Sequence, residues 1–103
     1  MTTRRALPQR RFCETFKLRR MQANRAYHIT VGYYDGDDRA PGEVFIAGAK
    51  AGQEIEAILR DAAVLISLCL QHGVPLETVQ HALTKDDDGK HSSVIGAIMG
   101  ALR

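Results

Sequence analysis

Apolar and polar residues alternate in three short runs in the first half of the chain, at 12–20, 26–36 and 43–48. Alternation with a period of two puts one set of side chains on one face of an extended strand, so each run predicts a β-strand. Turn-forming residues crowd the segment 35–42, DGDDRAPG, which predicts a hairpin between the second and third strands. We therefore expect an antiparallel sheet of at least three strands, whose second strand carries on one face Tyr27, Ile29, Val31 and Tyr33.

The pattern changes to that of an amphipathic helix from Gln53 onward. The spacing i, i+3, i+4, i+7 defines an apolar face made of Ile55, Ile58, Leu59, Ala62, Leu65, Ile66 and Cys69. The opposite side should be polar, yet it includes Val64, Leu68 and Leu70. A helix that is apolar nearly all round is buried on both sides. We expect it to be covered either by the sheet and another helix or by a second subunit, which predicts a homo-oligomer.

This helix ends at a sharp corner with the sequence HGVPLE. Gly73 fits the position just past a helix end, where the backbone turns left-handed. Pro75 fits the first turn of a following helix, where its missing N–H costs nothing. The second helix is short, at 75–83, and a polar loop follows at 84–91. Residues 92–103 then predict a third helix that opens with a serine cap.

Two glycines, Gly96 and Gly100, lie one turn apart in the third helix. Glycine inside a helix costs up to about 1 kcal/mol relative to alanine, so we expect another backbone to pack closely against this side. The order of elements is βββααα, which predicts an α+β domain. With 103 residues, the chain has the length of a single domain.

The charge is distributed unevenly along the chain. Residues 1–25 hold eight Lys and Arg against one acid, a net charge of +7, whereas residues 26–103 hold six against eleven, a net charge of −5. We expect a basic arm at 1–11 in front of a domain at 12–103. Such an arm contacts a polyanion or docks on an acidic surface, its own or a partner's. The residues proposed for this role are Arg4, Arg5, Arg10 and Arg11.

The sequence contains no apolar run of the roughly 18 residues that a membrane span needs. The arginines near the start are not followed by the apolar stretch of a secretory signal. Cys13 and Cys69 are then expected to be reduced thiols in a cytoplasmic protein without a membrane partner.

The sequence offers little catalytic or metal-binding chemistry. Cys69 and His72 are three residues apart, but a structural metal site needs four ligands, usually in paired short spacings. We therefore interpret Cys69 as a small apolar core residue and expect neither a metal nor another cofactor. Cys13 has no histidine placed to act as its base, so no catalytic residue is predicted. Lys50 and Gly52, before the first helix, are candidates to hold an anion, although they match no phosphate-loop spacing.

The corner between the first two helices also has the outline of a helix-turn-helix motif. A recognition helix should offer basic and amide groups to phosphates and base edges. Residues 75–84, PLETVQHALT, contain no Lys or Arg. DNA binding would therefore depend on the basic arm, and it stays as the alternative function.

Five segments in this order resemble the TSCPD domain, found at the C-terminus of adenosylcobalamin-dependent (class II) ribonucleotide reductases. The most specific are PGEVFIAGAKAG at 41–52 and AAVLISLCLQHGVPLE at 62–77, and the others are LPQRR at 7–11, TVGYYDG at 30–36 and, more loosely, SSVIGAIMGALR at 92–103. On this basis the corner is a packed helix-to-helix junction.

The resemblance implies a free-standing relative of an accessory domain, because the reductase's catalytic barrel, radical cysteine and cobalamin site are absent. It implies a cytoplasmic protein, linked to deoxyribonucleotide synthesis and DNA replication, that binds a partner protein, a reductase chain being one candidate, or a nucleotide. Within it, Gly42 and Glu43 would set the exit of the hairpin, and Gly73 and Pro75 would fix the corner.

Overall fold

The computed structural model describes residues 3–20, 25–35, 40–48 and 53–102. Three strands come first: β1 (Cys13–Arg20), β2 (Arg25–Tyr33) and β3 (Pro41–Gly48). Three helices follow: α1 (Gln53–Gln71), α2 (Leu76–Ala82) and α3 (Val94–Gly100). The predicted βββααα order and α+β class are confirmed.

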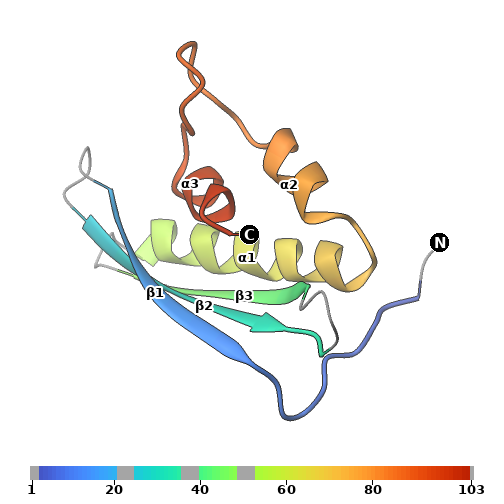
Figure 1. Cartoon of the computed structure of the whole chain (residues 1–103). Coiled ribbons are helices and arrows are strands. Elements are labelled where there is room, and N and C mark those ends of the chain that lie inside the picture. The colour runs from blue at the N-terminus through green and yellow to red at the C-terminus, as the bar shows by residue number, and fades with distance from the viewer. Residues whose placement is uncertain (1–2, 21–24, 36–39, 49–52, 103) are drawn as a thin grey trace.

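The strands form one antiparallel sheet in the order β1-β2-β3. In register, Ile29 of β2 lies between Phe16 of β1 and Ile46 of β3. All three helices lie on one side of the sheet, with α1 running along β3 (Figure 1). The core between the two layers is aliphatic apart from Tyr27, and its most deeply buried side chains are Ile29, Val31, Ile98 and Met99.

The alternation in β2 is interrupted near its end. The pairing with β3 shifts register between Gly32 and Tyr33. Tyr27, Ile29 and Val31 are buried as predicted, and half-buried Tyr33 packs against the core with them. Tyr34, one residue beyond the strand, is 4% exposed as well. The register shift, an irregularity of the β-bulge kind, re-aims the side chains that follow it, so Tyr34 is buried in addition to the predicted face.

The face that α1 buries differs from the predicted one. Leu59, Ala63, Ile66 and Leu70 are buried, whereas Leu65 is 63% exposed. Ile55, Ile58, Val64 and Leu68 are exposed as well. Cys69 is an exposed free thiol, so its interpretation as a core residue is wrong. Because the helix is apolar nearly all round, its periodicity could not determine which of its faces is buried.

Polar contacts to the outer edge of β3 set the rotation of α1. The Ser67 hydroxyl accepts a hydrogen bond from Val44 N at 2.9 Å, and its oxygen also lies 2.8 Å from Ala63 O and 3.4 Å from Val44 O. One turn later, Gln71 Nε2 donates to Gly42 O at 2.9 Å. Backbone groups at a strand edge need partners when they are covered. The side of α1 that carries Ser67 and Gln71 therefore faces the strand.

The ends of the helices follow the sequence signals closely. Gly73, two residues beyond the end of α1, has φ +91°, the left-handed backbone that was predicted. Pro75 precedes α2 as its N-cap, one position before the predicted first turn. Ser93 caps α3 by accepting a hydrogen bond from Gly96 N. The nearest neighbour of the glycines in α3 is the side chain of His91, which a methyl group at Gly100 would meet at 2.4 Å.

Candidate functional site

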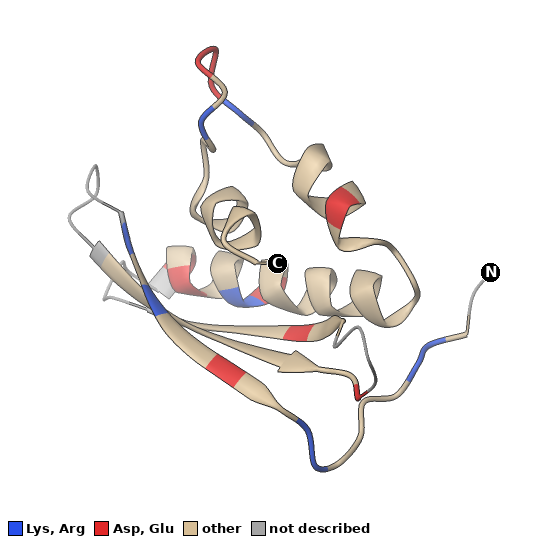
Figure 2. Ribbon diagram, viewed as in Figure 1, with Lys and Arg blue, Asp and Glu red and all other residues tan. Residues whose placement is uncertain are grey.

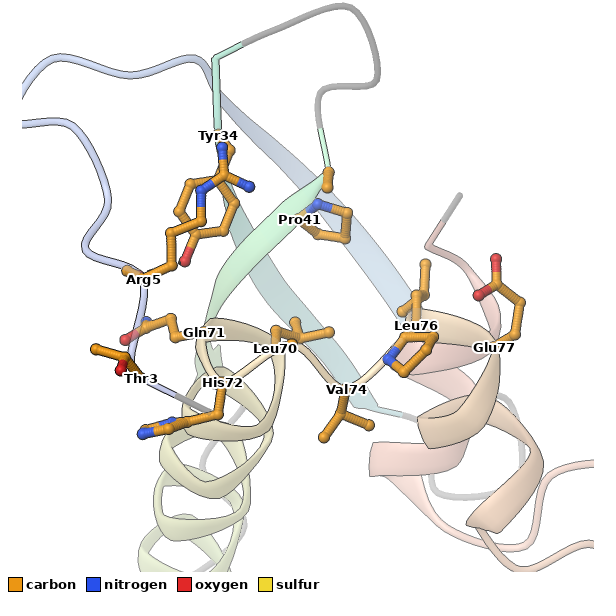
Figure 3. Close-up of a pocket in the computed structure, with 13 residues that line it drawn as sticks. Thr3, Arg5, Tyr34, Pro41, Leu70, Gln71, His72, Val74, Leu76 and Glu77 are labelled. Atoms are coloured by element: carbon orange, nitrogen blue, oxygen red, sulfur yellow. Dashed lines mark hydrogen bonds between the residues drawn. The ribbon is translucent and has the colours of Figure 1, made fainter. Parts of the chain in front are cut away.

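A cleft of about 530 Å³ lies between the start of the chain, the β2–β3 hairpin and the α1–α2 corner. Figure 3 shows its walls, with Arg5 and Tyr34 on one side and Glu77 on the other. Its lining is more apolar than polar. The residues that line it include Arg5, Tyr34, Leu70, Gln71, His72, Val74, Leu76 and Glu77.

Arg5 forms one wall of this cleft by docking on the body of the protein. Its amide N–H donates to Gln71 O at 2.7 Å, and Tyr34 Oη donates to Arg5 O at 2.6 Å. The guanidinium carbon of Arg5 lies 4.0 Å from the centroid of the Tyr34 ring. A cation over an aromatic face is attracted by the ring quadrupole. The wall is therefore held by two hydrogen bonds and one cation–π contact.

Gln71 connects three segments at the end of α1. Its side chain is buried, at 5% exposure. Oε1 accepts a hydrogen bond from Arg4 Nε at 2.5 Å, while Nε2 donates to Gly42 O. Gly42 itself is crowded, because a methyl group there would lie 2.5 Å from the Tyr34 ring and 2.9 Å from Leu7. The absence of a side chain at Gly42 thus lets the arm and the hairpin meet.

A second anchor of the arm lies on the face of the sheet turned away from the helices. Arg11 Nε donates to Glu43 Oε2 at 2.5 Å, and Arg11 Nη1 donates to Pro8 O. Glu43 is 7% exposed and lies over Gly32, where a methyl group would collide with the carboxylate. A buried carboxylate needs a partner, and Arg11 supplies it. Glu43 therefore anchors the arm, in addition to its position at the hairpin exit.

The structure thus distributes the predicted site residues unevenly. Arg4, Arg5 and Arg11 bind the chain's own body, and Arg10 is exposed. Figure 2 shows the arm's basic residues at separate places along the chain. Lys50 and Gly52, the candidate anion site, lie outside the described residues.

The corner side of the cleft carries His72, whose ring bonds to the backbone of α1. His72 Nδ1 lies 2.9 Å from Leu68 O, so Nδ1 carries the proton and donates it. Within the described parts of the chain, no three His, Cys, Asp or Glu side chains are placed to hold a metal ion. Exposed Glu77 lies on the opposite side of the cleft from Arg5 (Figure 3). The lining of the cleft is therefore more apolar than polar, with a basic residue on one side and an acidic residue on the other.

Three residues that matter here were not singled out from the sequence: Tyr34, Ser67 and Gln71. Ser67 and Gln71 lie within a helix that reads as continuously apolar, at i and i+4. Polar residues four apart in such a helix indicate a shared buried partner, and this signal could have found them. The register shift that buries Tyr34 leaves no comparable sign in the sequence.

Comparison with known proteins identifies the family. The model of the TSCPD domain matches residues 2–103, so the chain belongs to the TSCPD domain family, as its resemblance predicted. A stretch of 52 residues, half of the chain, is 40% identical to part of a vitamin B12-dependent ribonucleotide reductase of Rhodopirellula baltica (strain DSM 10527 / NCIMB 13988 / SH1). The match covers 5% of the length of that reductase. No solved structure matches the chain.

The helices contain no membrane-spanning candidate among the described residues.

Proposed function

We propose that this protein is an accessory domain related to ribonucleotide reductase that binds a partner protein, a reductase chain being the first candidate, through the cleft at the α1–α2 corner. The relation to a reductase supports the choice of partner. The whole reductase's activity is not assigned to this chain. The function proposed is recognition linked to deoxyribonucleotide synthesis, in the cytoplasm.

One observation carries this proposal: the arm is docked on the body, where Arg11 pairs with Glu43 and Arg5 lies over the ring of Tyr34. Phosphate binding requires cations that are available to release counterions, whereas these two hold the arm in place. The docked arm completes a preformed cleft whose lining is more apolar than polar. Preformed concave sites of this kind bind a ligand segment with little loss of conformational freedom.

The test is calorimetry of the binding between this protein and a purified reductase chain from the same organism. Glu77→Lys changes the charge of one wall, and we expect it to weaken binding about tenfold or more, as loss of a charged contact worth about 1.4 kcal/mol does. Thr78→Lys is the matched control, because Thr78 is the exposed neighbour outside the lining of the cleft. Equal affinity of the two variants and the wild type would exclude the cleft. Absence of any binding by the wild type would exclude the reductase chain as partner.

A nucleotide and a nucleic acid are the other ligands to be tested. A nucleotide in the cleft would compete with the reductase chain in the same calorimeter. DNA binding, the alternative function, would show a log–log salt slope of about −0.9 per phosphate contacted. Arg10→Ala would reduce that slope if exposed Arg10 touches a phosphate. We expect the affinity for the reductase chain to depend only weakly on salt concentration, because the lining of the cleft is more apolar than polar.

Self-association is the second part of the proposal. The exposed apolar side chains of α1 support it, since so small a body leaves them uncovered in a single chain.

A further inference from the structure

The open side of α1 is a continuous apolar surface. Ile58 is 58% exposed and Leu65 63% exposed, and Val64 and Leu68 are exposed beside them. Beyond Leu68, a groove of about 410 Å³ separates α1 from β3, and the ring of Phe45 stands on its far side at 56% exposure. Monomeric proteins rarely leave a contiguous apolar surface of this kind in water.

The spacing of this surface is that of a helix–helix seam. Ile58, Asp61, Leu65, Leu68 and His72 follow one another at intervals of three, four, three and four residues. A 3-4 repeat of this kind defines the contact line between two packed helices. The side of α1 that carries it is opposite the buried side, which holds Leu59, Ala63, Ile66 and Leu70. The seam therefore faces away from the chain's own core.

The charges along the open side differ between the two ends of α1. Glu54 and Asp61, both exposed, lie on the N-terminal half together with exposed Arg60, which lines the groove, so this half keeps a net negative charge. At the other end there is no acidic residue in the last turn, and Arg4 is held there by Gln71 at the rim of the groove. Figure 2 shows acidic residues, with a basic one, in the first half of α1 and no charged residue in the second. The surface therefore has a net negative charge at one end and a positive charge at the other.

From the seam and this charge division we propose that α1 is a homodimer interface in which the helices of two copies pack antiparallel. An antiparallel pair places the Glu54 end of each helix beside the Arg4 end of its partner copy, which a parallel pair would not do. In the alignment with the greatest overlap, Ile58 lies opposite Leu68 of the partner copy. Leu65 lies opposite Asp61 of the partner copy, and one polar residue in a seam fixes the alignment of the helices at a cost in stability.

This inference deepens the self-association in the proposed function, naming its surface and orientation. It does not depend on the identity of the reductase partner, because the apolar seam residues Ile58, Leu65 and Leu68 do not line the corner cleft. Leu65 and Val64 are absent from the lining of the cleft. A failure of reductase binding would therefore leave the dimer in place.

Sedimentation equilibrium over a range of concentrations tests the interface. We expect the wild-type chain to show a mass of twice 11.4 kDa that falls on dilution. Leu65→Glu should raise the dimer dissociation constant at least tenfold while the circular dichroism spectrum stays unchanged, because Leu65 is exposed in the single chain. Phe12→Glu is the control, since Phe12 is a similarly exposed apolar residue next to β1, and it should remain dimeric.

A charge exchange tests the orientation. Glu54→Lys and Arg4→Glu should each raise the dimer dissociation constant severalfold. The double variant should restore the wild-type value, because each contact of the antiparallel pair then again joins an acidic and a basic residue, with their positions exchanged. A wild-type chain that is monomeric at every concentration, or a Leu65→Glu variant as dimeric as wild type, would overturn the interface and leave a helix of another protein as its occupant. A double variant weaker than either single variant would overturn the antiparallel orientation.

Discussion

At the residue scale, the pair of Arg11 and Glu43 illustrates how burial decides the value of a charge. Glu43 is nearly buried, and its two oxygens face one guanidinium. Removing one member of such a pair leaves the other without its partner. The chain also has an exposed pair, Lys90 and Asp88, at 3.9 Å with both side chains largely in solvent. The same chemical contact therefore has two different environments in one molecule.

We predict that Glu43→Gln lowers the free energy of unfolding by about 1.5–3 kcal/mol, the range for a charge-assisted hydrogen bond that is partly buried. Chemical denaturation at neutral pH measures it. Asp88→Asn is the matched control and should change the same quantity by less than about 0.5 kcal/mol, because exposed ion pairs contribute little. If both substitutions changed the free energy of unfolding by similar amounts, burial would not strengthen the contact between Glu43 and Arg11.

The second residue-scale prediction concerns pH. Burial raises the pKa of Tyr33 above 10.0, and the nearby Glu14 charge and its hydrogen bond to the phenol raise it further. The folded state then favours the neutral phenol. This contribution to stability is present below pH 10.0 and is lost as the pH rises through the folded pKa. In a tyrosinate absorbance titration, Tyr33→Phe should remove a late-ionising component and Glu14→Gln should shift that component to lower pH. An unshifted titration in Glu14→Gln would contradict the assignment.

At the element scale, the hydroxyl of Ser67 contributes to the attachment of α1 to β3. Ser67→Ala removes the acceptor of Val44 N and leaves that amide at a covered strand edge. We predict a loss of about 1–2 kcal/mol in the free energy of unfolding. Thermal and urea denaturation measure this loss. Ser92→Ala is the control: Ser92 is exposed and bonds to Asp86, and its loss should stay within about 0.5 kcal/mol.

At the scale of the whole molecule, the arm and the body are joined by contacts distant in sequence. Tyr34→Phe removes the hydrogen bond to Arg5 O and should loosen the arm. We predict that the Arg5 amide, which donates to Gln71 O, exchanges its hydrogen at least severalfold faster in this variant. Exchange followed by NMR measures the rate. Tyr33→Phe is the control, because that hydroxyl contacts Glu14 and not the arm. Unchanged exchange in Tyr34→Phe would show that the arm is held without Tyr34.

The sequence by itself determined the elements and their order, because these follow from local periods and from residues with a fixed backbone preference. The alternation in 26–36 and the left-handed Gly73 are examples. Of the candidate site, it named the arm arginines, Glu43 and the corner, since their charges and turn chemistry are visible locally. The sequence could not predict which of these residues would contact one another.

The tertiary structure alone decided the rotation of α1 and the use of the arm. Because the helix is apolar on nearly every side, burial could not choose between its faces, and the choice fell to the polar contacts of Ser67 and Gln71 with β3. For the same reason Cys69, placed in the core by periodicity, is in solvent. The partners of Arg5 and Arg11 lie 29 and 32 residues away along the chain, at Tyr34 and Glu43. Contacts at such separations depend on how strands and helices pack, which no local pattern records.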